Sequence, residues 1–404
     1  MSICLTLKDM LPAWLSFIII IGIVLALSKY ELGITLTVGA LGFAILAGVD
    51  ILQSFFNVLT DPSILSLIII MILIPILGGI MEESGLMIEM IQKMRISRKA
   101  SLMMIPALFG LLPVPGGALM SAPIVQQIDK EEDPNKKVAI NVWYRHMLIM
   151  IYPLSSSLII ASILTDINLY ILVLGLLPGL ILMWVIGYIT LIKNVSPFSE
   201  QEERDLKRAF HNILPILIAP VIDFIGRTFF NFSVPELFLL GGLILSIWLA
   251  LRFGKMKFSS VKMISKKMKI WRFPLIIFSM FLFLEVFILS GAPEEIASVN
   301  LSVFLLILIG FFLGFATGRI QLPISILIPI YLAQFAGFTM PLLDFIFLYT
   351  SSSLGYLITP IHPCVSYSTE YFETNFMKAV KILGKPILIS FLILIGLYWL
   401  FLLI

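Results

Sequence analysis

The chain has few of the residues from which enzymes and soluble surfaces are built. Among 404 residues there are two cysteines and three histidines, and 13% of residues are charged while 60% are hydrophobic. The two cysteines, Cys4 and Cys364, are too few and too far apart to predict a disulfide framework or a metal centre. A mean hydropathy of +1.07 exceeds that of any soluble fold of this length. The composition therefore indicates an all-α, multi-pass protein of the cell membrane, in contact with the lipid bilayer.

The motifs of membrane enzymes and ATP-driven pumps are also absent. The three histidines, His146, His211 and His362, are too far apart for an HExxH metalloprotease motif. Glu82-Glu83 lacks the arginine found in intramembrane prenyl-protein proteases, because Met87 stands in its place. Neither a GxGD aspartyl motif nor a Gly/Lys phosphate loop is present. We therefore predict no enzymatic activity, no catalytic residue, no metal site, no cofactor except Na⁺ as a coupling ion, and no nucleic-acid partner.

One uncharged stretch, Ala100 to Ile128, is broken in its middle by Pro113, Pro115, Gly116 and Gly117. Basic residues flank it on both sides: Lys93, Arg95, Arg98 and Lys99 precede it, and Lys130, Lys136, Lys137 and Arg145 follow. Because Lys and Arg accumulate on the cytoplasmic side, we predict a re-entrant hairpin over about 100–128 that enters from the cytoplasm. Each limb of about 13 residues rises roughly 19 Å, to the middle of a ~30 Å core. Broken backbone at that depth must be buried or line a polar cavity, so the tip is a candidate binding site.

A second apolar segment, about 301–334, is interrupted by Thr317, Gly318, Arg319 and Gln321. Its flanks carry neither Lys nor Arg, which predicts a hairpin that enters from outside. With about ten spans of membrane-crossing length and both termini outside, all 27 basic residues are cytoplasmic except Lys8, Arg227 and Arg319. The predicted spans are 13–29, 33–49, 63–81, 138–164, 169–192, 212–230, 235–251, 273–290, 341–366 and 385–404.

The two halves of the chain resemble each other. Ser84-Gly85 recurs as Ser290-Gly291, Pro123 recurs as Pro329, and Pro153 recurs as Pro360, at a nearly constant offset. Each half holds five predicted spans and one hairpin, and an odd number of crossings inverts the second copy. We predict two inverted repeats, 1–192 and 212–404, joined by a cytoplasmic linker at 193–211. Inverted repeats with broken helices at the midplane are typical of secondary transporters.

The spans after the hairpins are predicted to be broken as well. The first break is at Tyr152–Ser157, and the second extends from the serines at 351–353 to Cys364. Proline removes a helical hydrogen bond, and hydroxyls or freed carbonyls can then coordinate a cation or substrate. The predicted substrate-binding residues are Pro113, Pro115, Gly116, Gly117, Thr317, Gly318, Arg319, Gln321, Ser351, Ser352, Thr359 and His362; the predicted ion-coupling residues are Ser155, Ser156, Ser157, Ser353 and Glu285.

Each of these residues also has a structural interpretation. Arg319 at membrane depth either pairs with a substrate oxyanion or bonds free carbonyls of the tip. His362 carries a proton, bonds the substrate or caps a broken helix, and Glu285 either carries a proton or cation or pairs with Arg319. The serines can line a site or simply allow helices to pack closely. Asp223 is expected to pair with Arg227 one turn on, and Cys364 is expected to fill apolar space.

The order of a span, a Pro/Gly-tipped hairpin and a Pro-broken span, repeated in inverted form, resembles the ion-transporter superfamily. That group includes gluconate, citrate and divalent-anion symporters and the large membrane subunit of tripartite periplasmic transporters. The stretches LLPVPGGALMSAPI and GYLITPIHPCVSYSTEYF are most similar to an uncharacterised prokaryotic integral-membrane family of that group. The Ser-Asn-Thr tips of the dicarboxylate members are absent, so no substrate is carried over. The resemblance implies an ion-coupled mechanism and a possible homodimer.

We therefore predict a secondary active transporter, a symporter or antiporter, of a small organic or inorganic anion, with a carboxylate as the expected class. Coupling is either to Na⁺ at the serine and carbonyl breaks or to H⁺ through His362 or Glu285. The alternative is a passive ion channel or a membrane subunit of a larger complex, because half-helix tips also build pores.

Overall fold

The chain folds into helices throughout the part that the computed structural model describes, which is residues 11–27, 31–94, 97–111, 117–195, 205–230, 232–335, 339–360 and 362–403. The first half contains α2 (Ala13–Ala26), α3 (Leu32–Ala47), α4 (Ile51–Thr60), α5 (Pro62–Glu83), α6 (Leu86–Met94), α7 (Arg98–Gly110), α8 (Gly117–Ile128), α9 (Pro134–Arg145), η1 (Leu148–Met150), α10 (Ser156–Thr165), α11 (Leu169–Gly187) and the π-helical η2 (Tyr188–Ile192). The second half contains α12 (Leu206–Phe229), α13 (Glu236–Phe253), α14 (Ser260–Lys267), α15 (Arg272–Leu289), α16 (Ala292–Ala297), α17 (Val303–Thr317), α18 (Gln321–Gln334), α19 (Leu342–Ile358), α20 (Pro363–Tyr371) and α21 (Phe376–Leu402).

Seven helical segments of the described chain are long and apolar enough to cross a membrane. They are Pro62–Glu83, Leu169–Ile192, Lys207–Phe229, Glu236–Phe253, Arg272–Leu289, Leu342–Tyr371 and Phe376–Leu402. A soluble protein has no use for so many apolar helices of about 20 residues. The fold is therefore that of a multi-pass, membrane-embedded helical protein.

Several helix boundaries differ from the predicted spans. The spans predicted at 13–29 and 33–49 are α2 and α3, which have only 14 and 16 residues. The last span begins nine residues earlier than predicted, at Phe376, because Lys378, Lys381 and Lys385 lie on its exposed face. A prediction from average hydropathy leaves this lysine-containing first part out of the span, although the helix is continuous from Phe376 to Leu402.

Two pairs of short helices lie where the sequence predicts hairpins. In the first pair, Arg98 at the start of α7 forms an ion pair with Asp129 just after α8, so the open ends of the two helices lie together. In the second pair, Gln334 at the end of α18 donates to the carbonyl of Leu301 just before α17, at 2.5 Å. The longest of these four helices, α17, has 15 residues and rises only about 22 Å. None of the four is long enough to cross a ~30 Å hydrocarbon core by itself.

The span predicted at 138–164 is broken. Helix α9 ends at Arg145, η1 follows, and α10 begins at Ser156. The backbone between Tyr152 and Ser155 makes only a turn, with the Ser155 amide donating to the Tyr152 carbonyl at 2.8 Å. The predicted break around Pro153 is confirmed.

The second break lies closer to the C-terminus than predicted. Helix α19 runs without interruption through the three serines at 351–353 and ends at Ile358. Ser352 and Ser353 donate to carbonyls one turn back, at 2.9 and 2.7 Å, and Ser351 donates to the Ile307 carbonyl of α17 at 2.6 Å. The prediction of unwound backbone at 351–355 was wrong because small hydroxylated residues are compatible with a buried helix when their hydroxyls return to backbone carbonyls. The chain leaves the helix only at Thr359.

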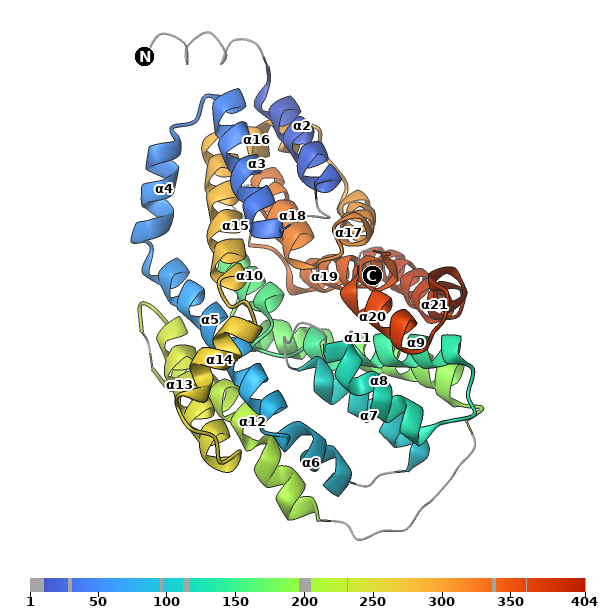
Figure 1. Cartoon of the computed structure of the whole chain (residues 1–404). Coiled ribbons are helices and arrows are strands. Elements are labelled where there is room, and N and C mark those ends of the chain that lie inside the picture. The colour runs from blue at the N-terminus through green and yellow to red at the C-terminus, as the bar shows by residue number, and fades with distance from the viewer. Residues whose placement is uncertain are drawn as a thin grey trace.

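Helices from the two halves pack against each other in matching pairs. Helix α10 packs on α18 while α20 packs on α8, and α5 packs on α13 while α15 packs on α3. Helix α6 likewise packs on α12 while α16 packs on α2. Figure 1 shows α2, α3, α15 and α16 grouped together and α5, α12, α13 and α14 in a second group, with the helix pairs and broken helices beside them. Both breaks are thus enclosed by elements of both halves.

Candidate functional site

Two helices begin at the same point in the protein interior. Gln321, the first residue of α18, donates from Nε2 to the Oγ of Ser156, the first residue of α10, at 2.8 Å. A separate chain of hydroxyls lies at the same helix start, with Ser155 Oγ 2.9 Å from Ser157 Oγ and Ser157 Oγ 2.7 Å from the Tyr349 hydroxyl. Neither helix has a side-chain N-cap hydrogen bond. Their first backbone amides therefore point at a shared polar region.

The turn between α17 and α18 places Arg319 next to this contact. Helix α17 ends when Gly318 adopts a left-handed conformation with a φ of 61°, which glycine adopts readily. The Thr317 hydroxyl donates to the Leu313 and Arg319 carbonyls, at 2.7 and 3.1 Å. The Thr317 hydroxyl thus supplies a donor to the backbone carbonyls at this turn. The Arg319 guanidinium is not needed for that role.

Arg145 is a second arginine in the interior, and the sequence analysis counted it only as a flanking basic residue. It is 5% exposed and ends α9, whose 12 residues place it roughly 18 Å from the start of that helix. Helix α7 presses on it: a Cβ on Gly110 would lie 1.8 Å from the Arg145 carbonyl oxygen. One terminal guanidinium nitrogen of Arg145 is buried without a hydrogen-bond partner.

Both arginines and the thiol of Cys364 lie within electrostatic range of the hydroxyl of Tyr356 on α19. Neither arginine forms an ion pair with any carboxylate in the described part of the chain, and Arg319 senses Glu31 only at longer range. Unpaired charge at this depth is costly and marks a functional site by default. Two cations without a partner anion are the main electrostatic feature of the site.

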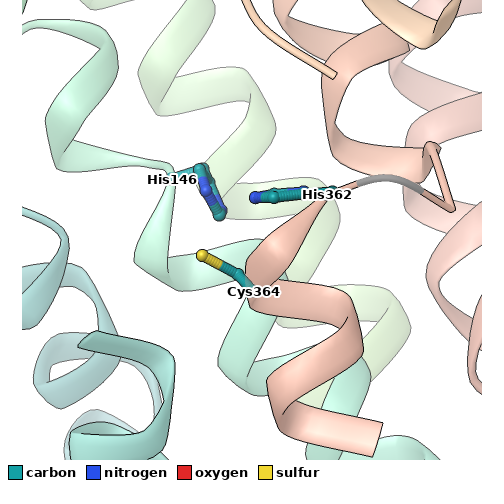
Figure 2. Close-up of side chains that lie close together, drawn as sticks. All are labelled: His146, His362 and Cys364. Carbon is teal, nitrogen blue, oxygen red and sulfur yellow. The ribbon is translucent and has the colours of Figure 1, made fainter. Parts of the chain in front are cut away.

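Two histidines and a cysteine meet beside Arg145. His146 follows α9 and His362 precedes α20, and their ring centroids lie 4.6 Å apart. Cys364, in the first turn of α20, completes a group whose ligand atoms all lie within 4.8 Å of one another. Figure 2 shows the three side chains converging from the two broken segments. The guanidinium of Arg145 interacts electrostatically with the Cys364 thiol.

A buried polar network holds the helices around this group. Asn141 donates from Nδ2 to the Ala118 carbonyl at 3.2 Å and to the Ser368 hydroxyl at 2.9 Å. Its Oδ1 accepts from the Ser121 hydroxyl at 2.6 Å. Asn141, Ser121 and Ser368 are 0% exposed, and they join α9 to α8 and α20. The network therefore fixes the relative positions of His146 and Cys364.

We expect Asn141→Ala to lower the free energy of unfolding by about 1–3 kcal/mol, because it leaves buried partners without hydrogen bonds. Ser368→Ala should have a smaller effect of the same sign. Ser366→Ala is the matched control, since Ser366 lies on the same helix but is exposed. The melting temperatures of the three variants in detergent test the network, and equal values for Ser366→Ala and Asn141→Ala would contradict it.

The remaining predicted residues lie in several environments. Pro113, Pro115 and Gly116 lie outside the described residues, and Gly117 is the first residue of α8. Thr359 is 1% exposed at the end of α19. Ser351, Ser352 and Ser353 bond backbone carbonyls, as described above, rather than an unwound site.

The acidic residues have partners of their own. Glu285 accepts from Asn57 at 2.7 Å and forms no ion pair with Arg319. Asp223 pairs with Arg227 at 3.0 Å, as predicted, and Arg227 also lies 3.6 Å from Glu236.

A cavity of about 710 Å³ adjoins Arg227 and Glu236. That cavity touches none of the residues around Tyr356, and it contains no cluster of unpaired cations, so we place the candidate site at the breaks.

The sequence analysis missed Arg145, His146, Tyr356 and Asn141, and it assigned Cys364 to apolar space. One signal was available, because Arg145-His146 falls inside the predicted span 138–164, where a charge is expensive. The proximity of His146 to His362 had no local signal, since 216 residues separate them in the numbering.

These features define the class of protein: a membrane-embedded, multi-pass helical protein whose interrupted helices surround a polar, cationic centre. The chain belongs to the family described as a protein of unknown function, DUF401, whose model matches residues 11–404. The comparison with curated proteins found no match.

Proposed function

We propose that this protein is a secondary active transporter of a small anion, with a carboxylate or similar oxyanion as substrate. The observation that carries the proposal is the pair of arginines, Arg145 and Arg319, which both lie within electrostatic range of Tyr356 and have no carboxylate partner among the described residues. Guanidinium groups bind carboxylates and other oxyanions through paired, charge-assisted hydrogen bonds. An anion between them would neutralise charge that the protein itself leaves unbalanced.

Helix termini add to this preference for an anion. The starts of α10 and α18 meet at Ser156 and Gln321, and α20 begins at the cluster, with His362 as its N-cap. Helix N-termini carry a partial positive charge and free amide donors. Discontinuous helices that present N-termini to an anionic group at mid-membrane are a transporter arrangement.

The packing pattern supports inverted repeats. In a two-fold relation between α2–α11 and α12–α21, α8 corresponds to α18 and α10 corresponds to α20. A contact between two helices that do not correspond to each other must then occur twice, as α10 on α18 and α20 on α8 do. The turns after α5 and α15 also match, since Gly85 and Gly291 both have a φ of 73° and the preceding serines both bond back into their helices. On this basis the second repeat begins with α12 at 206 rather than at 212.

In this proposal, the pairs α7–α8 and α17–α18 are re-entrant hairpins from opposite sides of the membrane. Together with the broken helices they form a unit that moves against the two peripheral groups of helices in Figure 1. Alternating access then exposes the arginine site to one side at a time. The coupling ion is either Na⁺ near Ser155 and Ser157 or a proton on His362 or Glu285. The resemblance to the ion-transporter superfamily fits the same mechanism.

Ligand-induced thermal stabilisation tests the substrate class directly. A ligand that binds only the folded protein stabilises it by about 2.7 kcal/mol at a concentration of 100 times its Kd. We expect one class of carboxylate or oxyanion to raise the melting temperature of the detergent-purified protein, and Arg319→Ala to abolish the increase. Arg252→Ala is the control, because Arg252 is exposed at the end of α13, and it should respond like the wild type.

The same panel distinguishes the coupling ions. Stabilisation that requires Na⁺ indicates the serine break, whereas stabilisation that depends on pH and not on Na⁺ indicates His362 or Glu285. Saturable, gradient-driven uptake into vesicles by the purified chain alone separates a transporter from a channel or a subunit. An Arg319→Ala protein that retains coupled uptake would remove the anion site from the proposal.

A further inference from the structure

The group formed by His146, His362 and Cys364 has the composition of a metal site. Each of the three offers one ligand atom, and all three ligand atoms lie within 4.8 Å of one another. The two histidines are 8% and 0% exposed, and Cys364 is half-buried. Figure 2 shows both rings and the thiol directed toward a common point. Metal–nitrogen and metal–sulfur bonds of about 2.0–2.3 Å would require the three atoms to move only slightly closer.

His146 has a ring nitrogen available for metal coordination. The Nδ1 of His146 lies 2.6 Å from the Val142 carbonyl, so Nδ1 carries the proton and Nε2 keeps its lone pair for a ligand. Such a carbonyl contact is the usual support behind a metal-binding histidine. That Nε2 lies 3.4 Å from the Tyr356 hydroxyl, which is long for a hydrogen bond.

His362 makes the stronger case. Its ring is fully buried, and although the backbone of Leu357 lies near it, neither ring nitrogen makes a hydrogen bond of good geometry in the described part of the chain. A buried polar group without a partner is costly and calls for a physical reason. A metal ion bound to one ring nitrogen supplies that reason.

We propose that His146, His362 and Cys364 bind one soft, monovalent transition-metal ion of the Cu⁺ type. Thiolate ligands favour soft ions such as Cu⁺, and imidazole also binds copper. Charge selects the monovalent ion: two neutral imidazoles, one thiolate and Cu⁺ sum to zero, whereas Zn²⁺ leaves a net positive charge beside buried Arg145. Binding forms one Cu–S and two Cu–N bonds and releases the thiol proton to solvent. The site does not depend on the proposed transport function and would equally exist in a channel.

Competition with a chromophoric Cu⁺ chelator under anaerobic, reducing conditions tests this site on the detergent-purified full chain. We expect one Cu⁺ per chain, with one sulfur and two nitrogen neighbours by X-ray absorption. Cys364→Ser should remove the sulfur neighbour and weaken binding by more than the 10- to 100-fold typical of a lost outer-shell contact. His146→Gln and His362→Gln should each remove one nitrogen neighbour. The melting temperature of each variant shows whether it is folded.

The chain supplies matched controls. Cys4 is its only other cysteine and His211 its only other histidine, and His211 is instead stacked on Phe253 at 3.8 Å. Cys4→Ser and His211→Ala should bind Cu⁺ like the wild type. The proposal is overturned if no Cu⁺ is bound, if folded Cys364→Ser binds it unchanged, or if Cys4→Ser abolishes binding. Preferential binding of Zn²⁺ at the same ligands would overturn the assignment to a monovalent ion.

Discussion

Arg227→Ala should lower the free energy of unfolding by about 3–5 kcal/mol, which is the usual cost of removing one partner from a buried ion pair. Arg227 is the only cation that contacts both Asp223 and Glu236 among the described residues. These two carboxylates are 0% and 3% exposed. Without the guanidinium they would face each other in an apolar environment with like charge. The variant should melt far below the wild type and be recovered poorly from membranes.

The network also explains why the effect exceeds that of an ordinary helix pair. Tyr170 donates to Asp223 at 2.9 Å and to the Pro220 carbonyl at 2.7 Å, so α11 and α12 are joined through the same carboxylate. Exposed pairs at this spacing contribute only about 0.3–0.5 kcal/mol. Arg227 is 9% exposed, and its loss leaves the whole network without a positive charge.

Two further variants identify the cause. Arg227→Lys keeps the charge and should recover part of the stability, while Arg227→Met combined with Asp223→Asn and Glu236→Gln removes both charge and repulsion and should melt above Arg227→Ala. Arg252→Ala, at an exposed position of α13, is the control for loss of a basic side chain. A melting temperature of Arg227→Ala equal to that of Arg252→Ala would show that water screens the carboxylates through the adjoining cavity.

Arg145→Ala should weaken anion binding by roughly 30-fold to several thousand-fold, the equivalent of about 2–5 kcal/mol for one partner of a buried charge pair. The reason is the position of Arg145, which is buried, lies next to Tyr356 and retains an unpartnered guanidinium nitrogen. Arg145→Lys keeps the charge but not the planar fork of donors, and its effect should be intermediate. The ligand is the anion that stabilises the wild-type protein, and its Kd is measured by titration.

A double-mutant cycle with Arg319 decides whether both arginines bind one ligand. If they do, the effects of Arg145→Ala and Arg319→Ala on binding should not add, whereas independent sites add within about 0.3–0.5 kcal/mol. Additive effects would place the two arginines at different ligands. If Arg145→Ala lowers the melting temperature but leaves Kd unchanged, Arg145 serves only to support the packing of α7 on α9.

Much of this fold follows from the sequence because hydropathy and backbone chemistry are local. A chain with 60% hydrophobic and 13% charged residues cannot cover a soluble surface, so its long apolar runs must be membrane helices. Pro153 was expected to interrupt a helix because it lacks an amide donor, and it lies in the non-helical stretch before α10. Gly318 and Arg319 were expected to interrupt an apolar segment, and the structure has a turn there.

Local signals were insufficient where a side chain's environment depends on distant segments. The serines at 351–353 look like a break, yet they form a helix because carbonyls on α17 and α19 accept their hydroxyls. Arg145 looks like a flanking charge, yet it is buried because α7 packs directly on the end of α9.

The sequence by itself determined the membrane class, the positions of the two pairs of short helices and the first broken helix, because each depends on residues adjacent in the chain. Only the tertiary structure decided which polar groups meet there. His146 and His362 belong to different halves of the chain, and they come within 4.6 Å of each other because α8, α9 and α20 are held together through Asn141. Contacts of that kind are set by packing and by the need to satisfy buried polar groups, and neither can be inferred from a local pattern.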